Sequence, residues 1–303
     1  MVRRRRRRLA ALLAVSALLA GACGDGTAQS GPSAPSTTTL ETTTSSQPVA
    51  TTSTSPTTPP AISQRATTDG QPDIVAEVRV PEGEGPFPAV VLVHGGGWVG
   101  GSPSLMSGLA AHLAGEGFLT VNARYHLAAS RSPGFPDALH DVACAVRYAA
   151  AHPRSDGFVA IVGFSAGAHL GAVVALTGDR YVVGCPVAGS GLPSRFVGLA
   201  GPYDVSRLGF AIVPFFGGGP EAKPDAWLAG NPQLLTDANP GLVSLLLLAE
   251  NDGFVDATHA VAFAEALIAS GSDVLVEVVE GARHTDLQDP DLVGDLIVTW
   301  LER

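Results

Sequence analysis

The sequence predicts an α/β fold in which helices cover both faces of a mostly parallel central sheet. Continuous apolar runs, each bounded by turn residues, recur from residue 89 onward. Segments with helical periodicity lie between these runs, and strands that alternate with helices are typical of a parallel sheet. Residues 66–303 are long enough to form one sizeable domain with its own core.

Six apolar runs are interpreted as buried strands, because a strand that is covered on both faces has no polar side. They are residues 89–96, 118–125, 158–165, 194–204, 243–252 and 274–281. An earlier segment, residues 74–83, alternates apolar and polar side chains, and this pattern predicts an antiparallel edge strand.

Helical patterns fill the intervals between these strands. They cover residues 105–117, 135–152, 165–178, 258–271 and 290–303. In sheets of this kind, functional groups gather at the carboxyl ends of the strands. Candidate site residues are therefore sought in the segments that follow each strand.

The first segment, residues 1–23, has the layout of a bacterial export signal. Six consecutive arginines precede an apolar run that ends near Ala20, and small residues lead to Cys23. A basic arm that binds nucleic acid would have the arginines without the apolar run. The letters LAGAC resemble a lipoprotein signal-peptidase site, in which Cys23 would become the lipidated first residue, although Ala20 stands where Leu is usual. We expect an exported protein, either a cell-surface lipoprotein or a secreted one.

Residues 24–65 consist almost entirely of Thr, Ser, Pro, Gly and Ala. Such a segment has too little apolar surface to offset the entropy of ordering it, so we expect a disordered tether. The chain has a net charge of -10 in spite of its N-terminal arginines. The exported part is therefore acidic, and we expect no nucleic-acid partner and no membrane contact beyond the lipid anchor.

Two cysteines remain besides Cys23, namely Cys144 and Cys185. In an oxidising compartment such a pair persists as a disulfide, and we expect one here. Two buried free thiols are the alternative, because the sequence does not give the distance between them.

Ser165 occupies the centre of the letters GFSAG, where an apolar strand ends and a helix of small residues begins. On a tight strand-to-helix turn the neighbours of the serine must be small, and its side chain projects above the sheet at the helix N-terminus. This context favours a nucleophile elbow. A serine that caps an ordinary turn is the alternative.

A serine nucleophile needs a base, and the base needs an acid that orients it. Among eight histidines, His284 lies in the segment after the last predicted strand, which should return over the elbow. Asp252 follows a strand between the serine and the histidine in chain order, so it is the leading candidate for the acid. The alternatives for the acid are Asp204, Glu250 and Asp256.

Attack on a carbonyl creates an oxyanion, which backbone N–H groups can stabilise. The letters HGGGW, residues 94–98, end another apolar strand, and their glycines leave the amides free to face a cavity. Gly96 and Gly97, together with Ala166 behind the serine, are the candidate donors. A phosphate-binding loop is the competing interpretation, but this segment lacks the Lys and Ser/Thr of such loops.

The segments HGGGW, GFSAGAHL, GPYDVS, ENDGFVD and RHTDL follow one another across residues 72–303. In combination they resemble the α/β-hydrolase superfamily, nearest its carboxylesterase, acetyl-xylan or feruloyl esterase-like and hormone-sensitive-lipase-like branches. The resemblance implies the α/β-hydrolase fold. It also implies a triad of Ser165, Asp252 and His284 and an oxyanion hole of Gly96, Gly97 and Ala166.

Two positions depart from the pattern of that superfamily. Ala168 replaces a glycine that is common after the elbow, and Asp256 stands where a proline is usual after the acid.

The segment Tyr203–Pro240 is the only stretch long enough to form a small cap. Its aromatic residues either line a pocket or form the core of the cap itself, and the sequence favours neither interpretation; they are Phe210, Phe215, Phe216 and Trp227. Trp98, beside the oxyanion segment, is the better candidate for a substrate-binding residue.

These features together predict a serine hydrolase that cleaves small-molecule carboxylic esters, with short acyl chains favoured, through an acyl-enzyme and without a metal or organic cofactor. An amidase or arylformamidase would use the same machinery. A non-catalytic binding or adhesion module on a hydrolase scaffold is the alternative from another class.

Overall fold

The structure, a computed structural model, describes residues 7–8, 62–66, 74–129 and 132–303. Most of the expected export signal and tether, including Cys23, lies outside these ranges. Strand β2 (Ile62–Ala66) pairs antiparallel with β3 (Ile74–Arg79). The folded domain therefore begins before residue 66, where composition alone places its boundary.

The described strands form one sheet in the order β1-β9-β8-β7-β6-β4-β5-β3-β2. Six strands run parallel to their neighbours: β4 (Phe87–Val93), β5 (Leu119–Ala123), β6 (Ser155–Phe164), β7 (Arg195–Leu199), β8 (Val243–Ala249) and β9 (Asp273–Val279). They coincide with the six apolar runs, which confirms the predicted fold class. At the outer positions, β3 pairs antiparallel with β5, and β1 (Arg7–Arg8) pairs antiparallel with β9. The antiparallel direction of β3 agrees with its alternating pattern, but β2 and not β3 occupies the edge.

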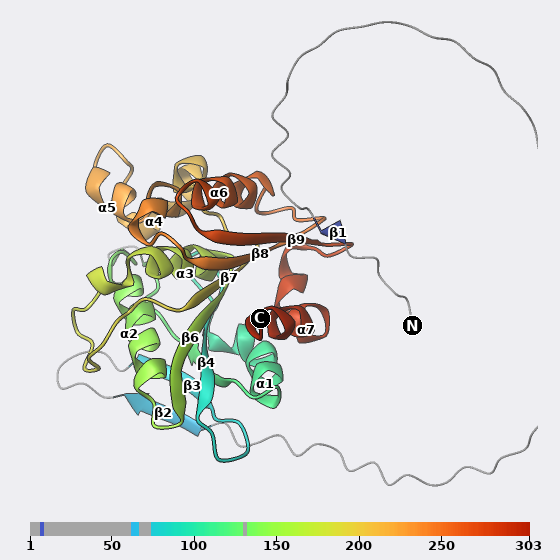
Figure 1. Ribbon diagram of the computed structural model, residues 1–303. Coiled ribbons are helices and arrows are strands. Elements are labelled where there is room, and N and C mark those ends of the chain that lie inside the picture. Colours follow the sequence, from blue (N-terminus) through green and yellow to red (C-terminus); the bar gives the residue numbers. More distant parts are fainter. Residues whose placement is uncertain (1–6, 9–61, 67–73, 130–131) are drawn as a thin grey trace, which may run out of the picture. The chain divides into compact units, whose positions relative to one another are not determined.

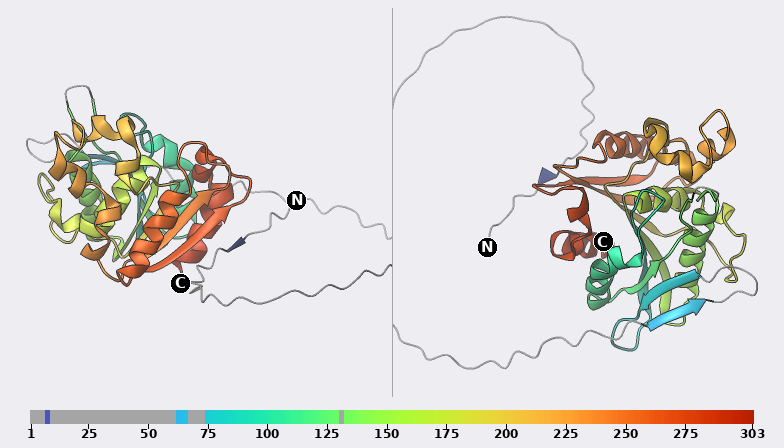
Figure 2. Two further views of the ribbon diagram at one scale, coloured as in Figure 1. Left: turned by 90° about the horizontal axis from the view of Figure 1, so that it is seen from above. Right: turned by 180° about the vertical axis from the view of Figure 1, so that it is seen from behind.

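Helices cover both faces of the sheet (Figure 1). Helices α1 (Ser107–Gly115) and α7 (Pro290–Leu301) lie side by side on one face, as the view from behind also shows (Figure 2). Helices α2 (Asp137–Ala151), α3 (Ala166–Thr177) and α6 (Thr258–Ala269) pack on the other. None of the helices in the described ranges is long and apolar enough to cross a bilayer.

Strand β4 shows why the strand sequences are continuously apolar. Val91 and Val93 point into the core beneath α2, α3 and α6, whereas Val90 and Leu92 point into the core beneath α1 and α7. Because successive side chains of a strand point to opposite faces, both sets of positions must be apolar when both faces are covered.

Short helices occupy the connections. Within the segment Tyr203–Pro240, hereafter the insertion, they are η3 (Val205–Arg207), η4 (Gly209–Ile212), α4 (Val213–Phe216), α5 (Pro224–Ala229), η5 (Pro232–Leu234) and η6 (Thr236–Ala238). Elsewhere they are η1 (Pro103–Met106), η2 (Gly178–Arg180) and η7 (His284–Gln288). The insertion packs through η5 and η6 against α3 and α6.

Candidate active site

Ser165 lies on a sharp turn between β6 and α3, with φ 52° and ψ -118°. The two glycines of the motif are required because backbone segments meet there. A Cβ at Gly163 would lie 2.4 Å from the carbonyl oxygen of Gly167, and a Cβ at Gly167 would lie 2.1 Å from that of Val93. The amide of Ser165 donates to the carbonyl of Leu199 at 2.8 Å, which fixes the turn to β7. The local sequence thus forms the strained elbow that its pattern predicts.

The structure brings Ser165, His284 and Asp252 together from the ends of three different strands. His284 Nε2 lies 3.0 Å from Ser165 Oγ, and His284 Nδ1 lies 2.7 Å from Asp252 Oδ2. Both side chains of the His–Asp pair are largely buried, with 10% and 7% of their surface exposed. This is the geometry in which an imidazole can accept a hydroxyl proton while a carboxylate fixes its tautomer.

The Asp252 carboxylate has defined partners for both oxygens. Oδ1 accepts hydrogen bonds from the backbone amides of Phe254 and Val255 at 2.8 and 2.9 Å, which leaves Oδ2 facing His284. Two rings flank the imidazole: Phe164, which is buried, has its centroid 5.0 Å away, and Phe254, which is exposed, 5.3 Å away. The histidine is therefore held by a carboxylate at one edge and by aromatic contacts.

The alternative acids have other partners. Asp204 Oδ1 accepts from the amide and hydroxyl of Ser206, Asp256 Oδ1 accepts from the amide and hydroxyl of Thr258, and Glu250 Oε2 accepts from the amide of Gly281. At Asp204 desolvation raises the pKa, but hydrogen bonds from Ser206 and Asn231 together lower it below its ordinary value. At Asp256 the hydrogen bonds from Thr258 lower the pKa, against a smaller effect of desolvation. Asp252 is the carboxylate that contacts His284.

The segment after β4 places its glycines in conformations that glycine adopts readily. Gly96 and Gly97 have φ values of 124° and 60°. In the described ranges, the N–H groups of Gly96, Gly97 and Ala166 have no protein acceptor. His94 orders the segment: its Nδ1–H donates to the carbonyl of Gly95 at 2.7 Å, and its ring stacks on Tyr125 at 4.3 Å. Burial lowers the pKa of His94, so the ring is neutral.

Trp98, the candidate for a substrate contact, is largely buried. Its side chain is 5% exposed, and its Nε1–H donates to Nδ1 of His169, on α3, at 3.1 Å. The indole also packs against Phe215 at a centroid distance of 6.0 Å. A buried indole N–H requires an acceptor, and His169 supplies it.

Backbone strain in the described ranges is concentrated around this site. Three non-glycine residues have positive φ: Trp98, Ser165 and Ala200, at 63°, 52° and 48°. They follow β4, β6 and β7 at their carboxyl ends, where the site residues gather. Such conformations cost on the order of 1–2 kcal/mol each and persist where the surrounding packing enforces them.

The aromatic residues of the insertion divide into two groups. Phe215, Phe216 and Trp227 are buried, and the Phe216 and Trp227 rings lie 4.8 Å apart, so they form the core of the insertion. Phe210 is 93% exposed. Of the two interpretations that the sequence left open, the structure supports a packing role for the three buried rings.

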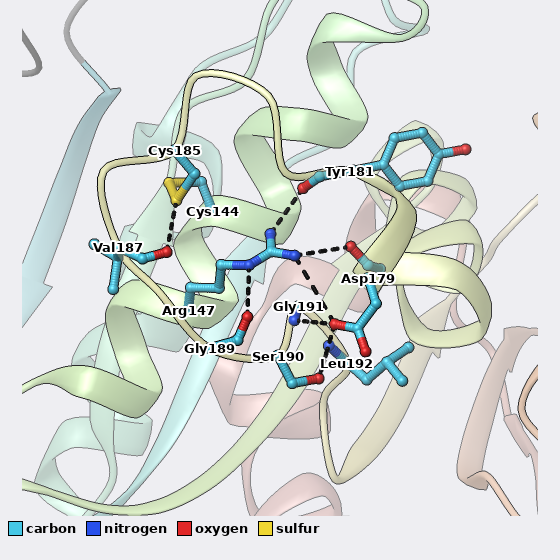
Figure 3. A network of polar contacts seen from close by, with 11 residues as sticks. Cys144, Arg147, Asp179, Tyr181, Cys185, Val187, Gly189, Ser190, Gly191 and Leu192 are labelled. Atoms are coloured by element: carbon cyan, nitrogen blue, oxygen red, sulfur yellow. Dashed lines mark hydrogen bonds and ion pairs between the residues drawn. A yellow bond between two sulfur atoms is a disulfide. The ribbon is translucent and has the colours of Figure 1, made fainter.

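The two cysteines that we expected to pair, Cys144 and Cys185, are joined by a disulfide with a Cα–Cα distance of 5.4 Å. One helical turn after Cys144 on α2, the buried Arg147 donates to the carbonyls of Tyr181 and Gly189 at 2.7 and 3.0 Å (Figure 3). The disulfide and the guanidinium thus fix the segment between η2 and β7 to α2, and neither contacts the triad.

Known proteins share parts of this arrangement. The BD-FAE family model matches residues 77–188, which include the glycine segment and the elbow. Esterase LipC of Mycobacterium tuberculosis is 31% identical over 126 residues, which cover 39% of this chain and 31% of that protein. The aligned part of this chain thus spans about a third of the curated relative's length.

Solved structures resemble the whole folded domain. The thermophilic esterase of Thermogutta terrifontis with bound propionate has a TM-score of 0.64 at 22% identity, covering 82% of this chain and 93% of that one. The acetyl ester-xyloside bifunctional hydrolase of Caldicellulosiruptor lactoaceticus has a TM-score of 0.65 at 17% identity, covering 78% and 90%. The sheet order, the elbow and these similarities show that this chain has the α/β-hydrolase fold, and that it is similar to proteins named as esterases.

Proposed function

We propose that this protein is a serine esterase that cleaves small carboxylic esters through an acyl-enzyme. The observation that carries the proposal is the position of His284, with Nε2 3.0 Å from Ser165 Oγ and Nδ1 2.7 Å from Asp252 Oδ2. The similarity to proteins named as esterases supports the same class of reaction.

In the proposed reaction, His284 carries one proton from the serine to the leaving alcohol. His284 Nε2 accepts the hydroxyl proton of Ser165 as Oγ attacks the ester carbonyl, and Asp252 stabilises the imidazolium that forms. The imidazolium then gives this proton to the leaving alcohol, which leaves the acyl group on Ser165. Water attacks the acyl-enzyme with His284 again acting as the base, and the acid is released.

The developing oxyanion requires donors that are already in place. The N–H groups of Gly96, Gly97 and Ala166 lie at the ends of β4 and β6 and, in the described part of the chain, bond to no protein acceptor. We assign these amides to the oxyanion hole. Loss of one such donor costs about 10²-fold to 10³-fold in kcat.

We propose that the site accepts short acyl groups. The glycine segment ends at Trp98, whose indole packs with the rings of His169 and Phe215. Structures of the Thermogutta terrifontis esterase hold propionate and butyrate, which are short acyl chains. Both observations favour acetyl to butyryl esters.

Labelling with a fluorophosphonate probe tests the nucleophile. We expect the native protein to be labelled and Ser165→Ala to remain unlabelled, and we expect turnover of p-nitrophenyl acetate and butyrate to exceed that of the octanoate ester. A native protein that takes no label would instead identify a non-catalytic binding module. Formanilides that turn over much faster than matched esters would identify an arylformamidase.

We also propose that the protein is exported and carries a lipid on Cys23, from the layout of residues 1–23. Metabolic labelling with an alkynyl fatty acid in a bacterial host tests this. Label on the native chain and none on Cys23→Ala is the expected result. A mature chain that begins after Cys23 and carries no lipid would show simple secretion.

A further inference from the structure

His169 connects two parts of the molecule that lie far apart in the chain. It sits on α3 one helical turn after Ser165 and is fully buried. Its Nδ1 lies 3.1 Å from Trp98 Nε1, and its Nε2 lies 2.8 Å from the carbonyl oxygen of Gly230. A ring on the helix of the nucleophile thus joins the glycine segment to the insertion.

These partners fix the tautomer of His169. An indole nitrogen can only donate, so Nδ1 must be the unprotonated acceptor, and Nε2 then carries the hydrogen that goes to Gly230. Burial lowers the pKa of His169 to about 4, with a smaller opposing effect from the hydrogen bond to Gly230. The ring is neutral at physiological pH, with both nitrogens engaged.

The Trp98 end of this connection bears directly on the oxyanion hole. Trp98 follows Gly97 and has a φ of 63°, a conformation that its side chain disfavours. Its carbonyl accepts from the amide of Ala128 at 2.8 Å, and its indole is held by His169. These two hydrogen bonds hold Trp98 in its strained backbone conformation. Trp98 directly follows Gly97, one of the proposed oxyanion donors.

The Gly230 end is equally constrained. A Cβ at Gly230 would lie 2.5 Å from the Phe216 ring, which itself packs on Trp227. The next residue, Asn231, accepts from the amide of Val205 at 3.4 Å. The carbonyl that receives the hydrogen of His169 therefore belongs to the packed core of the insertion.

We propose that His169 is a positioning residue that transmits the packing of the insertion to the oxyanion hole by holding Trp98, and through it Gly97, in place. This inference rests on the proposed esterase function. A histidine that served only to fill the core would make the same contacts, but its replacement would alter stability and leave the glycine segment and the turnover step unaffected.

Three variants separate these roles. His169→Phe fills the volume and removes both hydrogen bonds. His169→Gln restores an acceptor and a donor that are spaced as in the ring. Leu113→Ala, in the core beneath α1, lowers stability on the opposite face of the sheet and serves as the matched control.

We expect His169→Phe to lower kcat for p-nitrophenyl butyrate on the order of 10-fold with KM within about 2-fold, because the oxyanion contact that His169 supports is made in the transition state. His169→Gln should recover most of that loss, and Leu113→Ala should keep the native kcat well below its melting temperature. Native kcat in His169→Phe, or equal losses in the Phe and Gln variants, would overturn the inference.

Amide hydrogen exchange of the peptide that covers residues 94–101 gives a second readout, which does not depend on turnover. Exchange in His169→Phe should be faster than in the native protein, and Leu113→Ala should leave it unchanged. A native protein that neither hydrolyses esters nor takes the fluorophosphonate label would overturn the proposed function, and the exchange data would still decide whether His169 holds this segment.

Discussion

Asp252 and His284 meet at 2.7 Å although they are 32 positions apart in the chain and follow different strands, β8 and β9. Backbone hydrogen bonds align the two segments: the amide of Asn251 donates to the carbonyl of Ala282 at 2.8 Å, and that of Glu250 donates to Val279 at 3.2 Å. Because β8 and β9 are parallel neighbours, their carboxyl ends necessarily bring these segments together.

Replacing Asp252 by Asn tests this pairing. The amide removes the charge that stabilises the imidazolium and favours the wrong tautomer of His284, so kcat should fall on the order of 10⁴-fold. Steady-state kinetics with p-nitrophenyl butyrate give the measurement. Asp204→Asn is the matched control and should keep activity within a few-fold; the opposite ranking of the two variants would move the acid to Asp204.

The disulfide should contribute to stability without affecting catalysis. It closes a loop of 41 residues, for which the chain-entropy relation gives a contribution on the order of 3–4 kcal/mol. Urea unfolding of a Cys144→Ala, Cys185→Ala double variant should show this loss in the free energy of unfolding. Its kcat should match the native value, because the bridge lies on the segment between η2 and β7.

Native protein that is incubated with a reductant should unfold at the urea midpoint of that double variant. Equal midpoints for the native, reduced and double-variant proteins would mean that the bond is absent in solution. The native, reduced and double-variant proteins all keep Arg147 and its contacts to the same segment. A difference between their urea midpoints therefore reports on the disulfide alone.

The strands, and the meeting of Ser165, His284 and Asp252, could be predicted because their signals are local. Continuous apolar runs mark strands that are covered on both faces, and the residues that follow such strands fall at one edge of the sheet. Ser165, Asp252 and His284 each follow a run of this kind. The three residues also occur in the chain order Ser, Asp, His. The segments between them are long enough to hold the helices that connect parallel strands.

The role of Trp98 could not be predicted, because it depends on contacts distant in sequence. The sequence does not show that the indole of Trp98 donates to His169, or that His169 in turn contacts the carbonyl of Gly230. The sequence shows that His169 lies one helical turn after Ser165. It does not show that His169 donates to the carbonyl of Gly230, which lies 61 positions further on. Strand β2 could not be predicted for a similar reason. Its residues continue a polar segment, and their strand conformation depends on pairing with β3.

Lowering the pH should reduce the free energy of unfolding, in part because His169 becomes protonated in the unfolded chain. Its pKa in the folded protein, about 4, lies below its ordinary value of 6.5, so the unfolded chain binds more protons between these pH values. The free energy of unfolding therefore falls as pH falls through this window, by at most about 1.4 kcal/mol per pH unit from this group. Urea unfolding from pH 4.5 to 7 measures this dependence.

His169→Gln isolates this contribution, because it removes the titrating group and keeps hydrogen-bonding capacity. Asp141 acts in the opposite direction, since burial raises its pKa to about 6 and favours the folded state at low pH, and it is present in both proteins. The native protein should lose stability more steeply with acid than the variant. Parallel curves for the two proteins would contradict a neutral, buried His169.

Phe254 should contribute to recognition of the alcohol part of the substrate. Its ring is 83% exposed and lies 5.3 Å from the ring of His284, which in the proposed mechanism protonates the leaving alcohol. A flat apolar alcohol that leaves beside His284 can pack on this ring, a contact of about 0.5–1.5 kcal/mol, or roughly 2- to 13-fold in KM. Phe254→Ala should raise KM for 1-naphthyl butyrate by that factor and leave KM for methyl butyrate unchanged.

Phe210→Ala is the matched control for this effect, since Phe210 is also exposed, at 93%, but its ring has no contact with a triad residue in the described ranges. Its KM for both esters should equal the native values. If Phe254→Ala raises KM equally for the naphthyl and methyl esters, the ring serves to orient His284 and not to bind the alcohol. In that case kcat should fall as well, because the variant loses the ring that packs against the imidazole of His284.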